Sequence, residues 1–499
     1  MLPLPRQDLV ANTLAYENTP LIKLSGFREY DARWLLGSEI NLLGVQALGL
    51  GLGTFIHELG ERRIVVGHDF RSYSVSVKQA LMLGLASAGC EVLDIGLALS
   101  PTAYFAQFDL PCPCVAMVTA SHNENGWTGV KMGVGPPLTF GPEEIGRLKE
   151  IVLAGASTER PGGVVRHVAG MAERYIDDVV SRCALTRPLK VVCACGNGTA
   201  GAFAPQALRR MGVDVTPLDC DLDWTFPRYN PNPEDAQMLH AMSQAVRDRG
   251  ADLALGFDGD GDRCGVVDDE GEEIFADKIG LMLARDLAPL HPGSTFVVDV
   301  KSTGLFATDP VLAEHGASTV YWKTGHSYIK RKTAEIGALA GFEKSGHFFF
   351  NPPLGRGYDC GLTAAAAVLA MLDRNPGRKL SDLKRALPVA FTSMTMSPHC
   401  PDEAKYAVVA EVVAEYQALA AAGGLICGRK IVEVITVNGV RVALEDGSWV
   451  LVRASSNKPE LVVVVESTAS EDDMRALFRE EVKPRLAKHA EIGAYNQEI

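Results

Sequence analysis

Residues 62–70 read RRIVVGHDF; after a polar turn come VSVKQALMLGLASAG at 75–89 and EVLDIG at 91–96. The first and last segments have the length and apolar character of buried strands. The middle segment has the apolar periodicity of a helix, and it ends at a glycine. A strand, a helix and a second strand in this order predict a parallel βαβ unit.

The same pattern occurs twice more along the chain. Each copy has an apolar strand that ends in a small or polar loop, then an amphipathic helix, then a second strand. The segments are 189–201, 202–212 and 213–219 in one copy, and 294–304, 305–316 and 317–325 in the other. Three copies predict three similar α/β domains, in which the loops at the carboxyl ends of the strands are available for ligands.

The C-terminal part of the chain has a different pattern. Asn438-Gly439 and Asp446-Gly447 lie between alternating apolar and polar residues, which is typical of β-hairpin turns. A helical segment, 470–486, follows the last strand, so we expect an antiparallel α+β domain. The predicted fold class is therefore α/β, with three similar α/β domains plus a C-terminal α+β domain, and we expect the four domains to span 1–160, 161–272, 273–387 and 388–499.

Composition limits the classes of function. The 499 residues suffice for three or four domains, and 47% of them are hydrophobic, which argues against disorder. The net charge of −13 argues against binding to nucleic acid or to anionic membranes. The net charge does not exclude binding of anionic small substrates, because one site can be locally basic on an acidic protein.

Eleven cysteines are scattered along the chain. The pairs Cys112/Cys114 and Cys193/Cys195 have C-x-C spacing and not the C-x-x-C spacing of zinc or redox sites, so we expect buried free thiols in a reducing cytosol. The N-terminus has no signal-peptide pattern, and the apolar stretch at 42–56 is shorter than the ~18 residues of a membrane span. We therefore expect a soluble, cytoplasmic protein.

Ser121 ends an apolar strand, CVAMVTAS at 114–121, and is followed at once by His122 and ten residues later by Lys131. A serine at a strand end is by itself often a turn residue or a helix cap. A hydroxyl that carries a phosphoryl group needs cationic or metal partners for a charge of about −1.5 to −2. Glycines at 126 and 129 would let the backbone approach such a ligand closely.

Three aspartates, Asp258, Asp260 and Asp262, alternate with glycines between two apolar strands. Carboxylates so close together repel one another unless a cation compensates them, and hard oxygen ligands select Mg²⁺ or Ca²⁺. A calcium-binding EF-hand loop is excluded, because Arg263 and Asp269 replace the required glycine and glutamate and because strands, not helices, flank the loop.

Two further loops carry polar groups. Glu343, Ser345 and His347 follow an apolar segment, and alternate residues of an extended chain would point the same way, so Glu343 and Ser345 suit paired sugar hydroxyls. The stretch from Arg453 to Lys458 gathers many donors between two apolar strands, as a phosphate-binding loop would. An edge strand would explain the first loop equally well, and an ordinary surface hairpin the second.

One competing signal points to a dinucleotide. GNGTAG at 196–201 matches G-x-G-x-x-G after a strand and before a helix, and Asp219 ends the next strand. A NAD-dependent oxidoreductase is therefore an alternative, although it would leave the three aspartates and Ser121 without a role.

Together these loops resemble the signatures of the α-D-phosphohexomutase superfamily, most closely those of its bifunctional phosphomannomutase/phosphoglucomutase branch. The motifs occur in the family order and span almost the whole chain: FREYDAR (27–33), TASHN (119–123), DGDGDR (258–263), KTGHS (323–327), EKSGH (343–347) and RASSN (453–457). The chain departs from the family pattern at Trp34, where the family has a glycine after the arginine.

The resemblance implies four domains around a central active-site cleft. It implies that Ser121 is the phosphoserine and holds Mg²⁺ together with Asp258, Asp260 and Asp262. It further associates catalysis with Arg33, Lys131, His347, His122 and Arg263. It associates substrate binding with Tyr30, Lys301, His326, Glu343, Ser345, Arg453, Ser455, Ser456 and Asn457.

The expected activity follows from the same resemblance. It is the interconversion of mannose or glucose 1-phosphate and 6-phosphate, with hexose 1,6-bisphosphate as intermediate and activator. The same loops would also suit a phosphoglucosamine mutase, a phosphatase that acts through a phosphoserine, or a non-catalytic sugar-phosphate binder. We expect sugar phosphates as the partners, no nucleic acid or membrane, and a monomer or homodimer.

Overall fold

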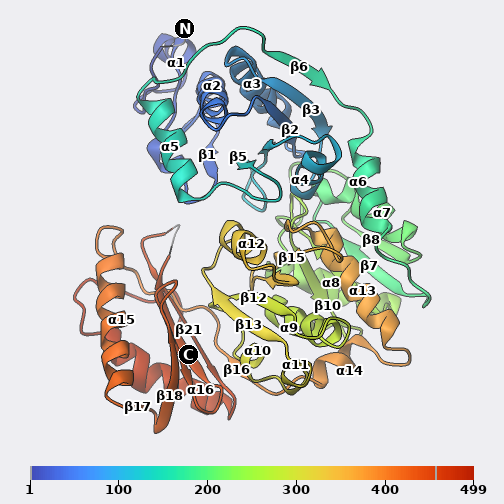
Figure 1. Ribbon diagram of the computed structural model, residues 1–499, viewed down its shortest axis with the longest axis vertical. Helices are drawn as coiled ribbons and strands as arrows, with labels where there is room; N and C mark the ends of the chain where they lie inside the picture. The colour runs from blue at the N-terminus through green and yellow to red at the C-terminus, as the bar shows by residue number, and fades with distance from the viewer. Residues whose placement is uncertain (1–2, 456–457) are drawn as a thin grey trace. The chain divides into compact units, whose positions relative to one another are not determined.

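The computed structural model describes residues 3–455 and 458–499 (Figure 1). The chain forms two compact units. The first contains the residues up to Ala276 together with Ser345–Ser381, and the second contains Asp277–Lys344 together with Asp382–Ile499.

The first unit begins with a six-stranded sheet in the order β1-β5-β4-β2-β3-β6. Strands β4, β2, β3 and β6 are parallel, whereas β1 and β5 run antiparallel to their neighbours. The βαβ unit expected at 62–96 is confirmed as β2, α3 and β3. The bounds are β1 Ala32–Leu35, β2 Arg63–His68, α3 Ser74–Ser87, β3 Glu91–Leu97, α4 Ser100–Asp109, β4 Cys114–Val118, β5 Trp127–Val134, α5 Pro142–Leu153 and β6 Val164–His167.

The apolar stretch near residue 42 forms helix α2, Leu42–Glu58, which packs against α3. Glycines make this close packing possible: a Cβ added at Gly49 would lie 2.2 Å from the carbonyl oxygen of Leu81, and one added at Gly84 would lie 2.1 Å from that of Gln46. Among the described residues, no helix is long and apolar enough to cross a membrane.

A second, five-stranded sheet of the same unit has the order β11-β10-β9-β7-β8. The copy of the pattern predicted at 189–219 is confirmed, because β7 and β8 are parallel and α7 connects them. The bounds are α6 Met171–Val180, β7 Lys190–Ala194, α7 Ala204–Arg210, β8 Asp214–Leu218, α8 Ala236–Arg249, β9 Leu253–Phe257, β10 Cys264–Val267 and β11 Glu273–Ile274. The first unit also contains β15 Phe348–Phe350, which is not a strand of this sheet, and α13 Gly361–Arg374.

In the second unit, β12 pairs in parallel with both β13 and β14. The single helix expected at 305–316 is two short helices, because Asp309 caps the second one and Pro310 is its first residue. The bounds are α9 Ala276–Leu287, β12 Thr295–Asp299, α10 Leu305–Thr308, α11 Pro310–Glu314, β13 Ser318–Trp322, α12 His326–Glu335 and β14 Ala340–Phe342.

The C-terminal sheet of the second unit has the order β16-β21-β20-β19-β18-β17, with antiparallel neighbours throughout. Both predicted hairpin turns are present, between β18 and β19 and between β19 and β20. The bounds are α14 Leu380–Arg385, β16 Phe391–Thr392, α15 Lys405–Ala421, β17 Leu425–Ile426, β18 Arg429–Ile435, β19 Val440–Leu444, β20 Trp449–Ala454, β21 Leu461–Ser467 and α16 Glu471–Ala476. The predicted fold class, α/β domains plus a C-terminal α+β domain, is confirmed.

Candidate functional site

Ser121 lies three residues beyond the end of the buried strand β4, and its own side chain is almost fully buried. Its φ is +51°, a left-handed conformation that costs energy for a residue with a Cβ and is often found at functional sites. The hydroxyl Oγ lies 3.0 Å from Asp258 Oδ2 and 3.2 Å from His122 Nδ1. Because the hydroxyl has one hydrogen, it donates to the carboxylate while the imidazole Nδ1 donates to Oγ.

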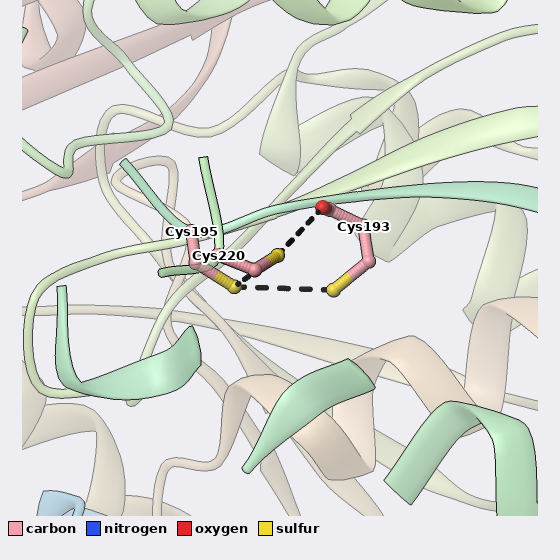
Figure 2. Close-up of side chains that lie close together, drawn as sticks. All are labelled: Cys193, Cys195 and Cys220. Carbon is pink, nitrogen blue, oxygen red and sulfur yellow. Dashed lines mark hydrogen bonds between the residues drawn. The ribbon is translucent and has the colours of Figure 1, made fainter. Parts of the chain in front are cut away.

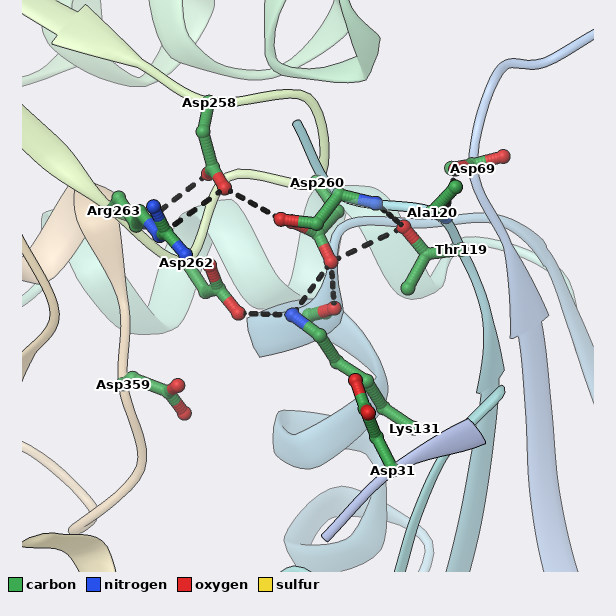
Figure 3. A network of polar contacts seen from close by, with 12 residues as sticks. Asp31, Asp69, Thr119, Ala120, Lys131, Asp258, Asp260, Asp262, Arg263 and Asp359 are labelled. Carbon is green, nitrogen blue, oxygen red and sulfur yellow. Dashed lines mark hydrogen bonds and ion pairs between the residues drawn. The ribbon is translucent and has the colours of Figure 1, made fainter. Parts of the chain in front are cut away.

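The loop from β9 to β10 carries Asp258, Asp260 and Asp262, which are all 0% exposed (Figure 3). Asp260 Oδ2 accepts hydrogen bonds from Ser100 Oγ at 2.7 Å and from Thr119 Oγ1 at 3.2 Å. The aspartate loop is therefore joined directly to the segment that carries Ser121.

Lys131, on β5, supplies positive charge to these carboxylates. Its Nζ donates to Asp260 Oδ2 at 2.7 Å and also to Asp262 Oδ2. Burial opposes the charged amine, but the two carboxylates outweigh it and hold the pKa of Lys131 well above its usual value. Burial, together with the charges of Asp262 and Asp260, raises the pKa of Asp258 well above its usual value.

Arg33, on β1, is buried and contacts the segment that carries Ser121. It donates to Asp31 Oδ2 at 2.9 Å and to the carbonyl oxygen of Thr119. Trp34, the departure from the family pattern, leaves this arrangement intact: it continues β1 opposite Thr128, and its indole Nε1 donates to the carbonyl oxygen of Lys23 at 2.8 Å.

Two histidines approach the site from different elements. The Arg263 guanidinium, burial and Arg33 lower the pKa of His122 well below its usual value, so this imidazole is neutral near pH 7. Arg263 Nε donates to His347 Nε2 at 3.0 Å, and His347 Nδ1 lies 3.1 Å from Asp359 Oδ2. His347 is therefore fixed between a cation and a carboxylate.

The three aspartates fit a hard divalent cation. Each offers a carboxylate oxygen, and these oxygens lie within 4.8 Å of one another. Oδ1 of Asp260 and Oδ1 of Asp262 are buried and accept no hydrogen bond from the described residues. Buried oxygens without donors are costly, and a magnesium ion would compensate them, because Mg²⁺ prefers such ligands.

The structure also brings in residues that the sequence did not indicate. Asp69 Oδ2 accepts from the backbone nitrogen of Ala120 at 3.1 Å, and Arg71 Nη2 donates to the carbonyl oxygen of Ser121 at 3.1 Å. Both follow β2, the strand beside β4. Their place at the carboxyl end of a parallel strand was the available signal. Asp359, which holds His347, follows no such pattern.

Several predicted substrate-binding residues lie in the second unit. Lys301, His326 and Glu343 follow β12, β13 and β14, so they lie at one edge of that parallel sheet. Asp299 joins these loops: its Oδ2 accepts from Thr324 Oγ1 at 3.1 Å, and its Oδ1 accepts from the backbone nitrogen of Lys344 at 3.3 Å.

The same sheet edge is connected to the predicted phosphate loop. The backbone nitrogen of Thr324 donates to Asn438 Oδ1 at 3.4 Å, and a Cβ added at Gly439 would lie 2.6 Å from Cα of Arg453. Arg453 and Ser455 are each only 8% exposed. Ser456 and Asn457 lie outside the described residues.

One expectation about local backbone is wrong. Lys344 and Ser345 form a turn, and Gly346 has a φ of +93°, so 343–347 is not an extended segment with alternating side chains. Ser345 and half-buried Tyr30 lie in the first unit, and Glu343 lies in the second.

The GNGTAG loop acts as a support and not as an open phosphate cradle. Gly196 to Ala200 are buried. The backbone nitrogen of Thr199 donates to the carbonyl oxygen of Gly259 at 3.2 Å, and a Cβ added at Gly198 would lie 3.1 Å from Cα of Gly259. The glycines therefore allow this loop to pack against the aspartate loop, which explains them without a dinucleotide.

Comparisons with known proteins agree with this geometry. Four family models match in order, described as phosphoglucomutase/phosphomannomutase alpha/beta/alpha domains I, II and III and the C-terminal domain, over residues 25–159, 173–271, 275–391 and 399–483. A phosphomannomutase/phosphoglucomutase from Pseudomonas syringae is 32% identical over 93% of this chain and 96% of its own. A phosphoglucomutase from Neisseria meningitidis is 33% identical over 88% and 92%, respectively.

Among solved structures, a phosphoglucomutase/phosphomannomutase family protein from Burkholderia thailandensis superposes with a TM-score of 0.84 at 28% identity, over 95% of this chain and 100% of the other. The similarity covers all four domains and includes the loops that carry Ser121 and the three aspartates. The chain belongs to the phosphoglucomutase/phosphomannomutase family.

Proposed function

We propose that this protein is a phosphomannomutase/phosphoglucomutase, which interconverts hexose 1-phosphate and hexose 6-phosphate through a phosphorylated Ser121. The observation that carries the proposal is the buried pairing of the Ser121 hydroxyl with Asp258 at 3.0 Å, beside two more carboxylates and Lys131. A serine that only capped a turn would not need three buried acids. The names of the relatives support the same activity.

Asp258, Asp260, Asp262 and the Ser121 oxygen are the residues that would hold Mg²⁺. When bound, the ion offsets the negative charge of the transferring phosphoryl group. Lys131 is a fixed cation in the same place, since its pKa is raised, and Arg33 is a second one.

In the first half-reaction, the free hydroxyl of the bound hexose monophosphate attacks the phosphorus of phospho-Ser121. The P–Oγ bond breaks, the hexose becomes a 1,6-bisphosphate and the hydroxyl proton must leave. After the bisphosphate has turned around, Ser121 Oγ takes the other phosphoryl group, and the product carries its phosphate on the opposite carbon. Free hexose 1,6-bisphosphate would act as the activator by phosphorylating Ser121 directly.

His347 is the proton acceptor that we assign. Arg33 remains a cation at any physiological pH, and Lys131 is held as an ammonium ion by its two carboxylates. His347 Nε2 accepts a hydrogen bond from Arg263, which means that it presents a lone pair, and Asp359 faces Nδ1. The substrate hydroxyl would replace Arg263 as the donor to Nε2.

The substrate contacts in this proposal are those that the sequence predicts. Glu343 would accept hydrogen bonds from sugar hydroxyls, with Lys301 and His326 from the same sheet edge. Arg453 and Ser455 would bind the phosphate that is not being transferred. Such a phosphate-binding loop has to serve both orientations of the bisphosphate.

The test is phosphorylation and turnover of a Ser121→Ala variant. Wild-type protein incubated with glucose 1,6-bisphosphate and Mg²⁺ should gain one phosphoryl group by intact mass, located on Ser121, and the variant should gain none and lose nearly all mutase activity. Ser181→Ala, which removes an exposed hydroxyl bonded to the carbonyl oxygen of Asp178, is the matched control and should behave as wild type. Near-normal turnover of Ser121→Ala with activator present would refute the proposal.

The sugar specificity is measured with mannose, glucose and glucosamine 1-phosphates under the same conditions. We expect the first two to be isomerised, because the named relatives at 32–33% identity are mutases of mannose or glucose phosphates. Faster conversion of glucosamine 1-phosphate would instead favour a phosphoglucosamine mutase.

A further inference from the structure

Three cysteine side chains converge in the second sheet of the first unit. Cys193 is on β7, Cys195 is the first residue after it, and Cys220 is two residues beyond β8. Since β7 and β8 are parallel neighbours, with Ala194 opposite Leu218, their carboxyl ends bring the three sulfur atoms together (Figure 2).

The sulfur atoms form a triangle with the size of a metal site. Cys193 Sγ lies 3.9 Å from Cys195 Sγ, and Cys220 Sγ lies 3.6 Å from Cys195 Sγ. All three sulfurs lie within 4.8 Å of one another. Thiolates bound at ~2.3 Å to one ion stand about 3.8 Å apart in a tetrahedral site and about 4.0 Å apart in a trigonal one.

The surroundings favour a soft cation. Cys193 and Cys195 are 0% exposed, while Cys220 is half-buried. Thiolates select thiophilic ions such as Zn²⁺ and Cu⁺ over Mg²⁺, so this triangle and the aspartate site would not compete for the same metal. Cysteines bind such an ion as thiolates, so thiol protons are displaced when the ion binds.

The cluster also contacts the loop at 196–201, which supports the aspartate loop of the candidate active site. The backbone nitrogen of Gly198 donates to the carbonyl oxygen of Cys195 at 2.8 Å, and Thr199 in the same loop holds the carbonyl oxygen of Gly259. A Cβ added at Gly201 would lie 2.1 Å from the carbonyl oxygen of Cys220. An ion that joined the three cysteines would therefore fix the loop on which the aspartate loop rests.

We propose that Cys193, Cys195 and Cys220 form a structural binding site for one thiophilic d¹⁰ cation, Zn²⁺ or Cu⁺. The proposal is independent of the mutase activity, because none of the three residues belongs to the catalytic or substrate-binding set. The ion is bound by exchange of thiol protons for metal, with no change of oxidation state.

The test uses reduced, full-length protein that is first stripped of metal and then placed in excess Mg²⁺, which is added to fill the proposed aspartate site. Co²⁺ is added as an optical probe, because a thiolate-bound cobalt ion gives an intense charge-transfer band that carboxylate ligands do not give. We expect one Co²⁺ per chain, displaced by Zn²⁺, and release of protons on binding. A second arm adds Cu⁺ against a competing chelator and decides between the two ions.

The variants are Cys195→Ser and Cys220→Ser, with Cys183→Ser as the matched control. Cys183 is a buried free thiol elsewhere in the first unit. We expect the cobalt band to be lost in both cluster variants and retained in the control. Should Cys195→Ser fail to fold, Cys220→Ser gives the same answer, because Cys220 is only half-buried. Wild-type protein without the band and without bound Cu⁺, or a Cys195–Cys220 disulfide in place of bound metal, would overturn the proposal.

Discussion

Gly259, between Asp258 and Asp260, sets how closely the aspartate loop approaches Ser121. A Cβ added at Gly259 would lie 2.4 Å from the carbonyl oxygen of Ser121. That oxygen cannot simply turn away, because Arg71 Nη2 donates to it at 3.1 Å. In a Gly259→Ala variant the two loops must therefore separate by about 0.6 Å before the contact reaches 3.0 Å, the lower limit of real Cβ contacts.

This separation acts on the distance that matters for phosphoryl transfer, from Ser121 Oγ to the carboxylates. Misplacement of reacting groups by about 1 Å costs up to ~10²-fold in rate, so we expect kcat to fall by roughly 10- to 100-fold. Overpacking of a close contact costs about 1–3 kcal/mol of unfolding free energy. The affinity for Mg²⁺ should fall as well, since two of its proposed ligands flank the substituted residue.

The assay follows glucose 1-phosphate to glucose 6-phosphate at saturating Mg²⁺ and bisphosphate, beside urea unfolding of each variant. Gly146→Ala is the control: Gly146 lies in α5, a Cβ there meets nothing within 4 Å, and alanine in a helix should add up to ~1 kcal/mol of stability. A Gly259→Ala protein with wild-type kcat and wild-type stability would show that Ser121 and the aspartate loop are not in contact, and the reasoning would fail.

Three other changes test separate parts of the site. Lys131→Met leaves Asp260 and Asp262 buried without the lysine cation, so the unfolding free energy in Mg²⁺-free buffer should fall by about 3–5 kcal/mol. Added Mg²⁺ should restore part of this loss. An equal loss with and without Mg²⁺ would contradict this. His122 has a lowered pKa in the folded protein, so the unfolded chain binds a proton on this residue more readily. The wild-type protein should therefore lose stability as the pH falls below 6.5. In parallel urea titrations, His122→Gln should lose less stability over the same pH range. Asp299→Asn weakens the hydrogen bonds by which Asp299 joins the loops at Thr324 and Lys344. The KM for hexose phosphate should rise by roughly 10-fold, while phosphorylation of Ser121 by the bisphosphate stays unchanged. An unchanged KM would show that Asp299 does not position the substrate loops.

Local sequence pattern predicted the βαβ units because each is made of neighbouring segments. Strands β2 and β7 are apolar and buried, and the helices after them end at glycines, which periodicity detects. It did not detect the break in the third helix, although Asp309-Pro310 carries the capping signal. The turn at Lys344 escaped as well, because Gly346 was the only local sign of it.

The site residues also divide into those that a local motif marks and those that only contacts between distant segments bring in. Ser121 and the three aspartates could be found because each is concentrated in one short motif. Asp359 could not, because its importance lies in a contact between separate segments: it reaches His347 from beyond β15. For Asp69 and Arg71 the sequence offered only their place after β2, because their contacts with Ala120 and Ser121 also join separate segments. A single sequence records no such pairing, and their residue types alone are too common to mark them.

Charge explains why the serine, the lysine and the aspartates have to work as one unit. Without phosphate, Lys131 is the cation that contacts Asp260 and Asp262. Phosphorylation of Ser121 adds a charge of about −1.5 to −2 beside carboxylates that are already 0% exposed, which a buried site tolerates only with an added cation. A divalent ion supplies nearly the same charge with opposite sign, so metal binding and phosphorylation should each favour the other. The bound Mg²⁺ should accordingly be held more tightly by phospho-Ser121 protein than by the dephosphorylated form, and by linkage Mg²⁺ should shift the equilibrium between the two forms toward phospho-Ser121.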